Sequence, residues 1–334
     1  MLRFIVRRLL QLIPTLIGLS ILLFVWLHNL PGGPEAALLG DRTTPERRKQ
    51  IRALLHLDDP IWVQYGRFVK NMLKGDFGTS VQSNRPVIDE FATRFPATIE
   101  LGITAMLIAV IVGIPLGYLA ARRRGGFLDS SVVTSSLLGI CIPVFFLAYI
   151  LKEIFSVQLG WFPSIGQLSP GLETTKVTGF AVLDGLLTGD LTVTSDALAH
   201  LVLPGIALAS IPLAVIVRMT RASVLEVLGE DYVRTAESKG LKESTIRARH
   251  VLRNAMLPVI TSIGLLTGSL LSGAVLTETV FDFNGIGSFL ARAIDARDYS
   301  VLMGFILFIA TMYVLINLLV DISYSIIDPR VRVR

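Results

Sequence analysis

The sequence predicts an all-α, polytopic integral membrane protein with six transmembrane helices. The chain has 334 residues, of which 52% are hydrophobic and only 17% are charged, whereas soluble domains carry about 25% charged residues. Its apolar residues form continuous runs, as membrane-spanning helices require, and do not alternate as in a transmembrane barrel. Basic residues gather between these runs, as is typical of cytoplasmic loops. This composition excludes a disordered chain, a coiled coil and an ordinary soluble enzyme.

Six apolar runs are long enough to cross a bilayer, whose hydrocarbon core of about 30 Å needs about 20 helical residues. They cover residues 9–26, 101–121, 131–151, 197–217, 256–277 and 299–320. A seventh run, 177–187, is too short and contains Asp184, so we predict that it lies in a loop. The basic N-terminus and first run also fit a cleaved signal peptide. That run exceeds the usual signal-peptide length and no clear cleavage motif follows it, so we expect a retained helix.

The basic residues predict the orientation of these helices. With the N-terminus inside, the cytoplasmic segments are 1–8, 121–129, 218–255 and 329–334, and they hold 17 of the 31 Lys and Arg residues. Ten of the others lie in segment 29–97, and long loops cross membranes largely regardless of their charge. Both termini are therefore predicted to be cytoplasmic. The net charge of +5 then reflects this topology, and we expect contact with membrane lipid and no nucleic-acid partner.

This topology divides the chain into four parts. They are a first transmembrane helix with its cytoplasmic N-terminus (1–28), an extracytoplasmic loop region (29–97), a core of five further helices (98–325) and a cytoplasmic tail (326–334). A structureless loop as long as 29–97 is uncommon in a compact domain. We interpret it either as a lid on the helix bundle or as a docking surface for an external partner.

Prolines and glycines inside the predicted spans indicate hinge and packing positions. Proline removes a backbone donor and can kink a helix, while glycines four residues apart allow close helix packing. The predicted positions are Pro115, Pro143, Pro204, Pro212, Pro258, Gly264 and Gly268. Gly113 and Gly117 have the same four-residue spacing. Such helices suit a bundle that opens and closes, but static membrane proteins contain them too.

The sequence lacks the common catalytic motifs. It has no phosphate-binding loop, no H-E-x-x-H pair and no G-x-S-x-G turn. Its single cysteine, Cys141, excludes an internal disulfide and a cysteine-rich metal site. The ionisable residues His200, Glu278 and Asp321 lie near span ends, where we expect their side chains to reach the interface. We therefore predict no catalytic residue, no metal and no cofactor in this chain.

Segment 218–255 is the only long cytoplasmic loop. Residues with a spacing of four, which indicates one helical stripe, are Val224, Leu228, Tyr232, Ala236 and Gly240. The stripe ends in two small residues, and charged residues that include Arg234 and Glu237 surround it. This pattern predicts a short helix that docks into a groove of a soluble partner. A helix lying on the membrane surface is the alternative, but its polar face would favour Lys and Arg alone.

Several stretches resemble one family of transport proteins. The stretches are Arg7-Arg8-Leu9-Leu10-Gln11-Leu12-Ile13-Pro14-Thr15, His28-Asn29-Leu30-Pro31-Gly32, Gly75-Asp76-Phe77-Gly78-Thr79-Ser80, Arg94-Phe95-Pro96-Ala97-Thr98, Ile142-Pro143-Val144-Phe145-Phe146, Glu278-Thr279-Val280-Phe281 and Asp328-Pro329-Arg330. They run almost from end to end. In them the chain resembles the inner-membrane permease of binding-protein-dependent ABC importers, and specifically the B-type (OppB/DppB-like) subunit of the oligopeptide/dipeptide class.

The resemblance implies the permease fold of a type I ABC importer in a bacterial plasma membrane. Residues 234–240 match the family's ATPase-contacting loop, with Arg-Thr-Ala in place of its Glu-Ala-Ala triplet and with the glycine retained. Segment 230–247 would then couple this chain to an ATPase through Tyr232, Arg234, Ala236, Glu237 and Gly240. The other implied partners are a C-type permease, two ATPase subunits that bind ATP and Mg, and an extracytoplasmic substrate-binding protein.

Three functions remain open from the residues. The chain is the permease of an importer, an ion-coupled carrier or channel, or a membrane assembly protein, and only the first requires a bound ATPase. Similar permeases carry short peptides, glutathione, nickel chelates or haem. Nothing in the spans chooses among these solutes.

Overall fold

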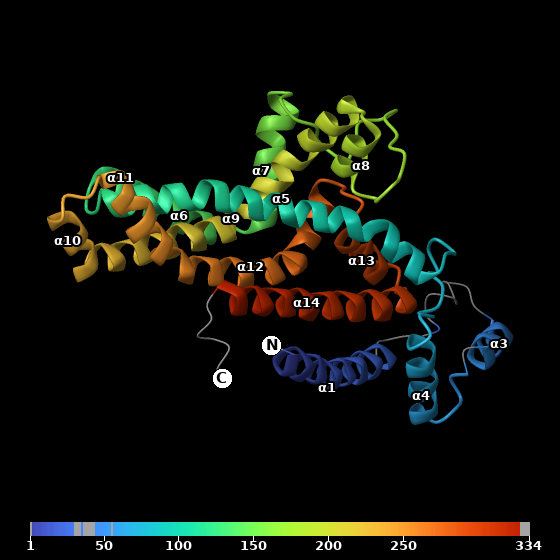
Figure 1. The fold of residues 1–334 in the computed structure, drawn as a ribbon. Coiled ribbons are helices and arrows are strands. Elements are labelled where there is room, and N and C mark those ends of the chain that lie inside the picture. Colours follow the sequence, from blue (N-terminus) through green and yellow to red (C-terminus); the bar gives the residue numbers. More distant parts are fainter. Residues whose placement is uncertain (1, 30–34, 36–43, 55, 328–334) are drawn as a thin grey trace. The chain divides into compact units, whose positions relative to one another are not determined.

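A computed structural model of the chain describes residues 2–29, 35, 44–54 and 56–327 (Figure 1). These residues fold into helices joined by turns, and they contain no strand beyond one isolated bridge between Thr79 and Pro86. The helices are α1 (Leu2–His28), α3 (Pro45–Leu54), α4 (Ile61–Met72), α5 (Val87–Arg122), α6 (Phe127–Cys141), α7 (Val144–Leu151), the π-helix η1 (Lys152–Gln158), α8 (Ala181–Thr188), α9 (Leu191–Leu228), α10 (Asp231–Ser238), α11 (Glu243–Thr245), the π-helix η2 (Ile246–Leu252), α12 (Arg253–Val280), α13 (Ile286–Asp295) and α14 (Tyr299–Ile327).

The chain forms two compact units. Unit 1 contains residues 1–96 and 284–334, and unit 2 contains residues 97–283. The ends of the chain fall in one unit because α14 packs against α1 and α13. The basic cluster Arg330, Arg332 and Arg334 and most of the predicted tail lie outside the described residues.

The predicted spans correspond to long apolar helices, with one exception. Helices α1, α5, α9, α12 and α14 are each long and apolar enough to cross a membrane. The short run at 177–187 overlaps α8, which has only 8 residues, so the prediction that it does not span is confirmed.

The third predicted span, 131–151, is wrong as a continuous helix. It is divided between α6 and α7–η1, whose axes are bent by 104°. Ile142 has an extended backbone with φ −80° and ψ 122°. Pro143 forces this conformation because its ring crowds the preceding residue and it has no N–H to continue the helix. The proline that the sequence indicates as a kink therefore ends one helix and begins another.

The direction of α14 in unit 1 bears on whether the bent pair crosses the membrane. Leu27, near the end of α1, shares a buried cluster with Tyr299 and Phe305 at the start of α14. The two helices are therefore antiparallel, as Figure 1 also shows. Antiparallel first and last spans require an even number of crossings. If α1, α5, α9, α12 and α14 each cross once, the bent pair supplies the sixth crossing.

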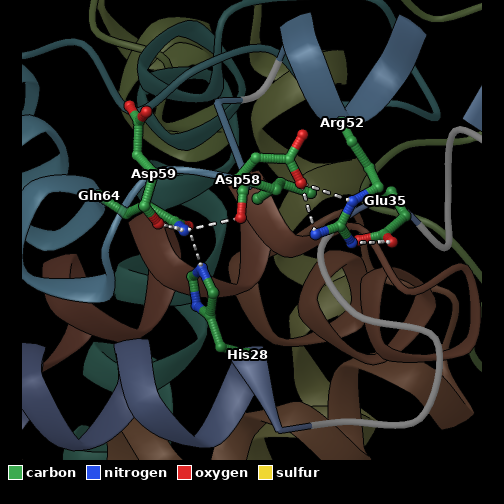
Figure 2. Close-up of polar contacts among 7 residues, drawn as sticks. His28, Glu35, Arg52, Asp58, Asp59 and Gln64 are labelled. Carbon is green, nitrogen blue, oxygen red and sulfur yellow. Dashed lines mark hydrogen bonds and ion pairs between the residues drawn. The ribbon is translucent and has the colours of Figure 1, made fainter. Parts of the chain in front are cut away.

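Within the predicted extracytoplasmic region 29–97, the described residues include α3, α4 and the start of α5, and polar contacts tie α4 to α1 (Figure 2). The Nε2 atom of His28, at the end of α1, lies 3.2 Å from Oε1 of Gln64 in α4. The Gln64 amide nitrogen donates to the carbonyl oxygens of Leu57 and Asp59 at 3.0 and 2.8 Å. These two bonds set the orientation of the Gln64 amide, so the described part of this region is folded against the end of the first span.

Two carboxylates organise the neighbouring turns of unit 1. Asp58 accepts hydrogen bonds from the guanidinium of Arg52 at 2.9 and 3.1 Å (Figure 2), and these bonds to the carboxylate raise the pKa of Arg52. The fully buried Asp298 accepts from the Ser80 hydroxyl and the Val81 amide at 2.8 and 2.7 Å. Asp298 precedes α14, so this contact ties the segment after α4 to the start of the last span.

Unit 2 is built around α9, which packs against α6, α7, α8 and α12. Glycines bring α5 close to it. A Cβ atom at Gly117 would lie 2.5 Å from the Val217 carbonyl oxygen, and one at Gly113 would lie 3.0 Å from the Ile216 side chain. The close packing predicted from the spacing of these two glycines is confirmed.

Candidate coupling site between α9 and α12

The long cytoplasmic loop predicted at 218–255 is mostly helical. Helix α9 continues to Leu228, and α10, α11 and η2 lead into α12. Glu230 is extended, with φ −74° and ψ 143°, and it separates α9 from α10. Asp231 is the first residue of α10, where its negative charge interacts favourably with the positive N-terminal end of the helix dipole.

The prediction of one helical stripe from Val224 to Gly240 is wrong because the chain changes direction between α9 and α10. Val224 and Ala236 are both buried, but they meet from different helices within one cluster. The cluster members are Ala121, Val224, Val233, Ala236, Ile246, Val251 and Ala255. Ala236 therefore holds α10 against the rest of unit 2, and its side chain does not belong to an exposed docking surface.

The opposite side of α10 is exposed. Tyr232 is 40% exposed and the Arg234 side chain 71% exposed, and Glu237 and Gly240 are also exposed. The Tyr232 hydroxyl accepts a hydrogen bond of 2.9 Å from the side chain of Asn254. We define the outer face of α10 as Tyr232, Arg234 and Glu237 together with Gly240, which lies just after the end of the helix. This face combines both charges with an aromatic side chain, as suits contact with a soluble protein.

Gly240 ends this helical segment in a left-handed conformation with φ +70°. Its amide donates to the carbonyl oxygen of Glu237 at 2.9 Å, and the next amide, of Leu241, donates to Ala236 at 3.3 Å. A Cβ atom at Gly240 would have no neighbour within 4 Å. The chain therefore reverses at this glycine, and the surrounding space is open.

The family is shown by two models that together match nearly the whole chain. Residues 113–333 match the "binding-protein-dependent transport system inner membrane component", and residues 1–102 match the N-terminal part of such membrane components. The chain belongs to this family. It is a multi-pass inner-membrane permease of an ABC importer, whose family works with an ATPase and a substrate-binding protein.

Individual relatives agree with this assignment. The permease is 47% identical over 336 residues to the dipeptide transport system permease protein DppB of Escherichia coli (strain K12), covering 99% of each chain. It is 39% identical over 332 residues to the glutathione transport system permease protein GsiC of Escherichia coli O1:K1 / APEC, again covering 99% of each. The MetNI methionine ABC transporter in inward-facing conformations has a similar fold, with a TM-score of 0.53, 16% identity and coverage of 70% and 93% of the two chains.

One ion pair joins the candidate coupling segment, 230–247, to α5. Glu243 of α11 pairs with Arg247 of η2, and it lies 3.4 Å from the Arg122 guanidinium at the end of α5. Both Arg122 and Glu243 are exposed, so this contact is screened by water and contributes little stability.

The remaining predicted hinge and packing residues lie inside continuous helices. Pro115 lies in α5, Pro258 in α12, and Pro204 and Pro212 are both buried within α9. Gly264 and Gly268 are buried in α12, which packs against α9. Of the prolines predicted as hinges, only Pro143 ends a helix.

The ion pair between Asp129 and Arg221 was not predicted from the sequence. Nε of Arg221 donates to one carboxylate oxygen of Asp129 at 2.5 Å, and its Nη2 donates to the other at 2.8 Å. Asp129 lies in the first turn of α6 and Arg221 lies in α9. Its only sequence signal was a lone acidic residue beside the basic cluster 122–124, and that signal does not indicate a partner 92 residues away.

The prediction that span-end ionisable groups reach the interface is wrong for Glu278 and His200. Glu278 is fully buried and accepts a hydrogen bond of 2.6 Å from the Thr98 hydroxyl of α5. His200 is 5% exposed and lies 2.9 Å from the carbonyl oxygen of Asp196. The contact of Glu278 with α5 joins two helices, and the sequence of one helix cannot show it.

Proposed function

We propose that this permease imports dipeptides and forms half of the translocation path together with a second, C-type permease. The observation that carries the proposal is the 47% identity to a dipeptide permease across 99% of both chains. Two ATPase subunits bind ATP and Mg and hydrolyse the nucleotide, and an extracytoplasmic binding protein delivers the peptide. The permease supplies a path that opens alternately to each side, and ligands shift this equilibrium by their differential affinity for the two states.

Both termini face the cytoplasm in this proposal, because basic residues concentrate there in membrane proteins. The antiparallel arrangement of α1 and α14 supports placing both ends on one side. A cysteine at Lys74, which is exposed after α4, should react with a membrane-impermeant thiol reagent from outside the cell when Cys141 is replaced by serine. Reaction only in inverted vesicles would contradict this orientation.

The outer face of α10 docks onto the ATPase in our proposal, and the buried Ala236 holds the helix in place from behind. This division of roles follows from exposure. Tyr232 and Arg234 are open to a partner, whereas Val233 and Ala236 are already packed within the permease.

Gly240→Arg is expected to abolish ATP-driven uptake and copurification of the ATPase, while the permease still inserts into the membrane. The position is open within the chain, so the long side chain obstructs only a partner. The left-handed backbone adds a cost of about 1–2 kcal/mol for any residue with a Cβ atom. Uptake into proteoliposomes and the ATPase-to-permease ratio after purification measure the two effects.

Gly240→Asn is the matched control, because asparagine tolerates a positive φ and has a short side chain. We expect this variant to keep most uptake. Normal uptake and ATPase association in Gly240→Arg would refute docking at this face, and equal loss in both variants would assign the effect to the backbone.

The glutathione permease relative makes glutathione the second candidate solute. Dipeptide is favoured because the dipeptide relative is the more similar of the two. Uptake of labelled dipeptide and labelled glutathione by the reconstituted complex decides between them. Uptake that persists without ATP would instead support an ion-coupled carrier.

A further inference from the structure

The Asp129–Arg221 pair has the geometry of a rigid connection. Both carboxylate oxygens of Asp129 face the guanidinium of Arg221, and this two-point contact fixes orientation as well as distance. Asp129 is only 4% exposed. Its Oδ2 also accepts the Gly125 amide at 2.9 Å, so the same side chain holds the turn that leads into α6.

Helix α9 is held from a second side at the same level. Gly117 of α5 brings its backbone against Val217, Thr220 and the amide of Arg221. The fully buried Thr220 adjoins Arg221 in this crossing. Helices α5, α6 and α9 are therefore joined around one turn of α9.

The coupling segment begins directly after this turn. Val224, one turn beyond Arg221, is fully buried in the cluster that holds Val233 and Ala236 of α10. A continuous set of contacts therefore runs from α10 through α9 and the ion pair to α6. Helix α6 is one arm of the span that Pro143 breaks, and it packs along α9 (Figure 1).

We propose that Asp129 and Arg221 are positioning residues that transmit the movement of α10 to the broken span. The inference rests on the proposed coupling of α10 to an ATPase. In this role the pair moves α6 together with α9 when the ATPase subunits close. Without the pair, α9 still moves together with α10, but α6 no longer moves together with α9.

The test compares Asp129→Asn, Arg221→Gln and the double variant in the reconstituted importer complex. Each single variant leaves one charge in a partly buried site, so stability falls in both. The double variant removes both charges, and its melting temperature should recover toward that of the unmodified complex. Asparagine at 129 retains an oxygen that can accept the Gly125 amide. Arg218→Gln is the matched control, because Arg218 is exposed on the same helix one turn earlier.

The deciding readout is peptide imported per ATP hydrolysed. We expect the double variant to bind the ATPase and hydrolyse ATP normally but to import about tenfold less peptide per ATP, the factor produced by about 1.4 kcal/mol. The control should keep the normal ratio. Recovery of stability together with a normal ratio would overturn the proposal and leave the pair a purely structural role.

Spin labels at Glu226, near the end of α9, and Ser135 of α6, both exposed and both outside the outer face of α10, provide a second readout. Their separation should stay constant between ATP-free and ATP-bound complexes of the unmodified importer and should change with nucleotide in the double variant. A constant separation in both would overturn the proposal. Failure of the unmodified permease to bind an ATPase would instead refute the proposed function. Failure of this inference and failure of the proposed function are therefore distinguishable.

Discussion

Replacing Gly117 with alanine is expected to destabilise the permease by about 1–3 kcal/mol, the usual cost of overpacking a close contact. The new methyl group would lie 2.5 Å from the Val217 carbonyl oxygen and 2.7 Å from Thr220 Cβ. The first of these atoms is backbone, so relief requires α5 and α9 to separate. The melting temperature of the purified permease and the fraction that elutes as a single species measure the effect.

Gly102→Ala is the control within the same helix. A Cβ atom at Gly102 would meet nothing within 4 Å, and both variants gain the same helix propensity of about 1 kcal/mol. We therefore expect Gly102→Ala to be neutral or stabilising. Equal melting temperatures for the two variants would show that α5 and α9 do not depend on this close approach.

Replacing Thr98 with valine is expected to cost about 1–3 kcal/mol, because a buried acceptor loses its hydrogen-bond donor. The Thr98 hydroxyl donates to Glu278 at 2.6 Å, and the two side chains are 3% and 0% exposed. This bond joins α5 to the end of α12. Thermal unfolding of the complex measures the loss, and reduced uptake should accompany it if the two helices must stay joined.

Thr279→Val serves as the matched comparison. Thr279 follows Glu278 in α12 and is exposed. Its hydroxyl donates to the Val275 carbonyl oxygen of the same helix, so the substitution removes a hydroxyl without breaking a contact between helices. We expect it to change stability little. Glu278→Gln keeps an oxygen that can accept from Thr98, so it should lose less than Thr98→Val. An equal effect of the two threonine variants would contradict a stabilising role for the α5–α12 bond.

The membrane-spanning helices could be predicted from the sequence because the length of an apolar run depends only on consecutive residues. A helix must bury about 20 apolar residues to cross a bilayer, so run length alone predicts spans such as α1 and α14. The break at Pro143 was not predicted. A proline inside an apolar run is compatible with a continuous helix, as Pro204 in α9 shows, and with a full interruption, as at Pro143. Which of the two occurs depends on packing around the run.

A short helix within 218–255 was predicted from the sequence, but which of its residues are buried was not. A spacing of four residues predicts a stripe only while one helix continues, and Glu230 interrupts it. After that interruption Tyr232 faces outward and Ala236 inward. The conformation at Gly240 depends on local backbone geometry, because a chain reversal with φ +70° favours a residue without a side chain.

The sequence by itself determined that this is a helical membrane protein, where most of its spans lie and which transporter family it resembles. These properties depend on composition, run length and motifs along the chain. Only the tertiary structure decided that Asp129 pairs with Arg221, that Glu278 is buried beside Thr98 and that Ala236 supports α10 from within. Each of these contacts joins different helices. Their geometry depends on how the helices pack together, and the spacing of residues within one helix does not predict it.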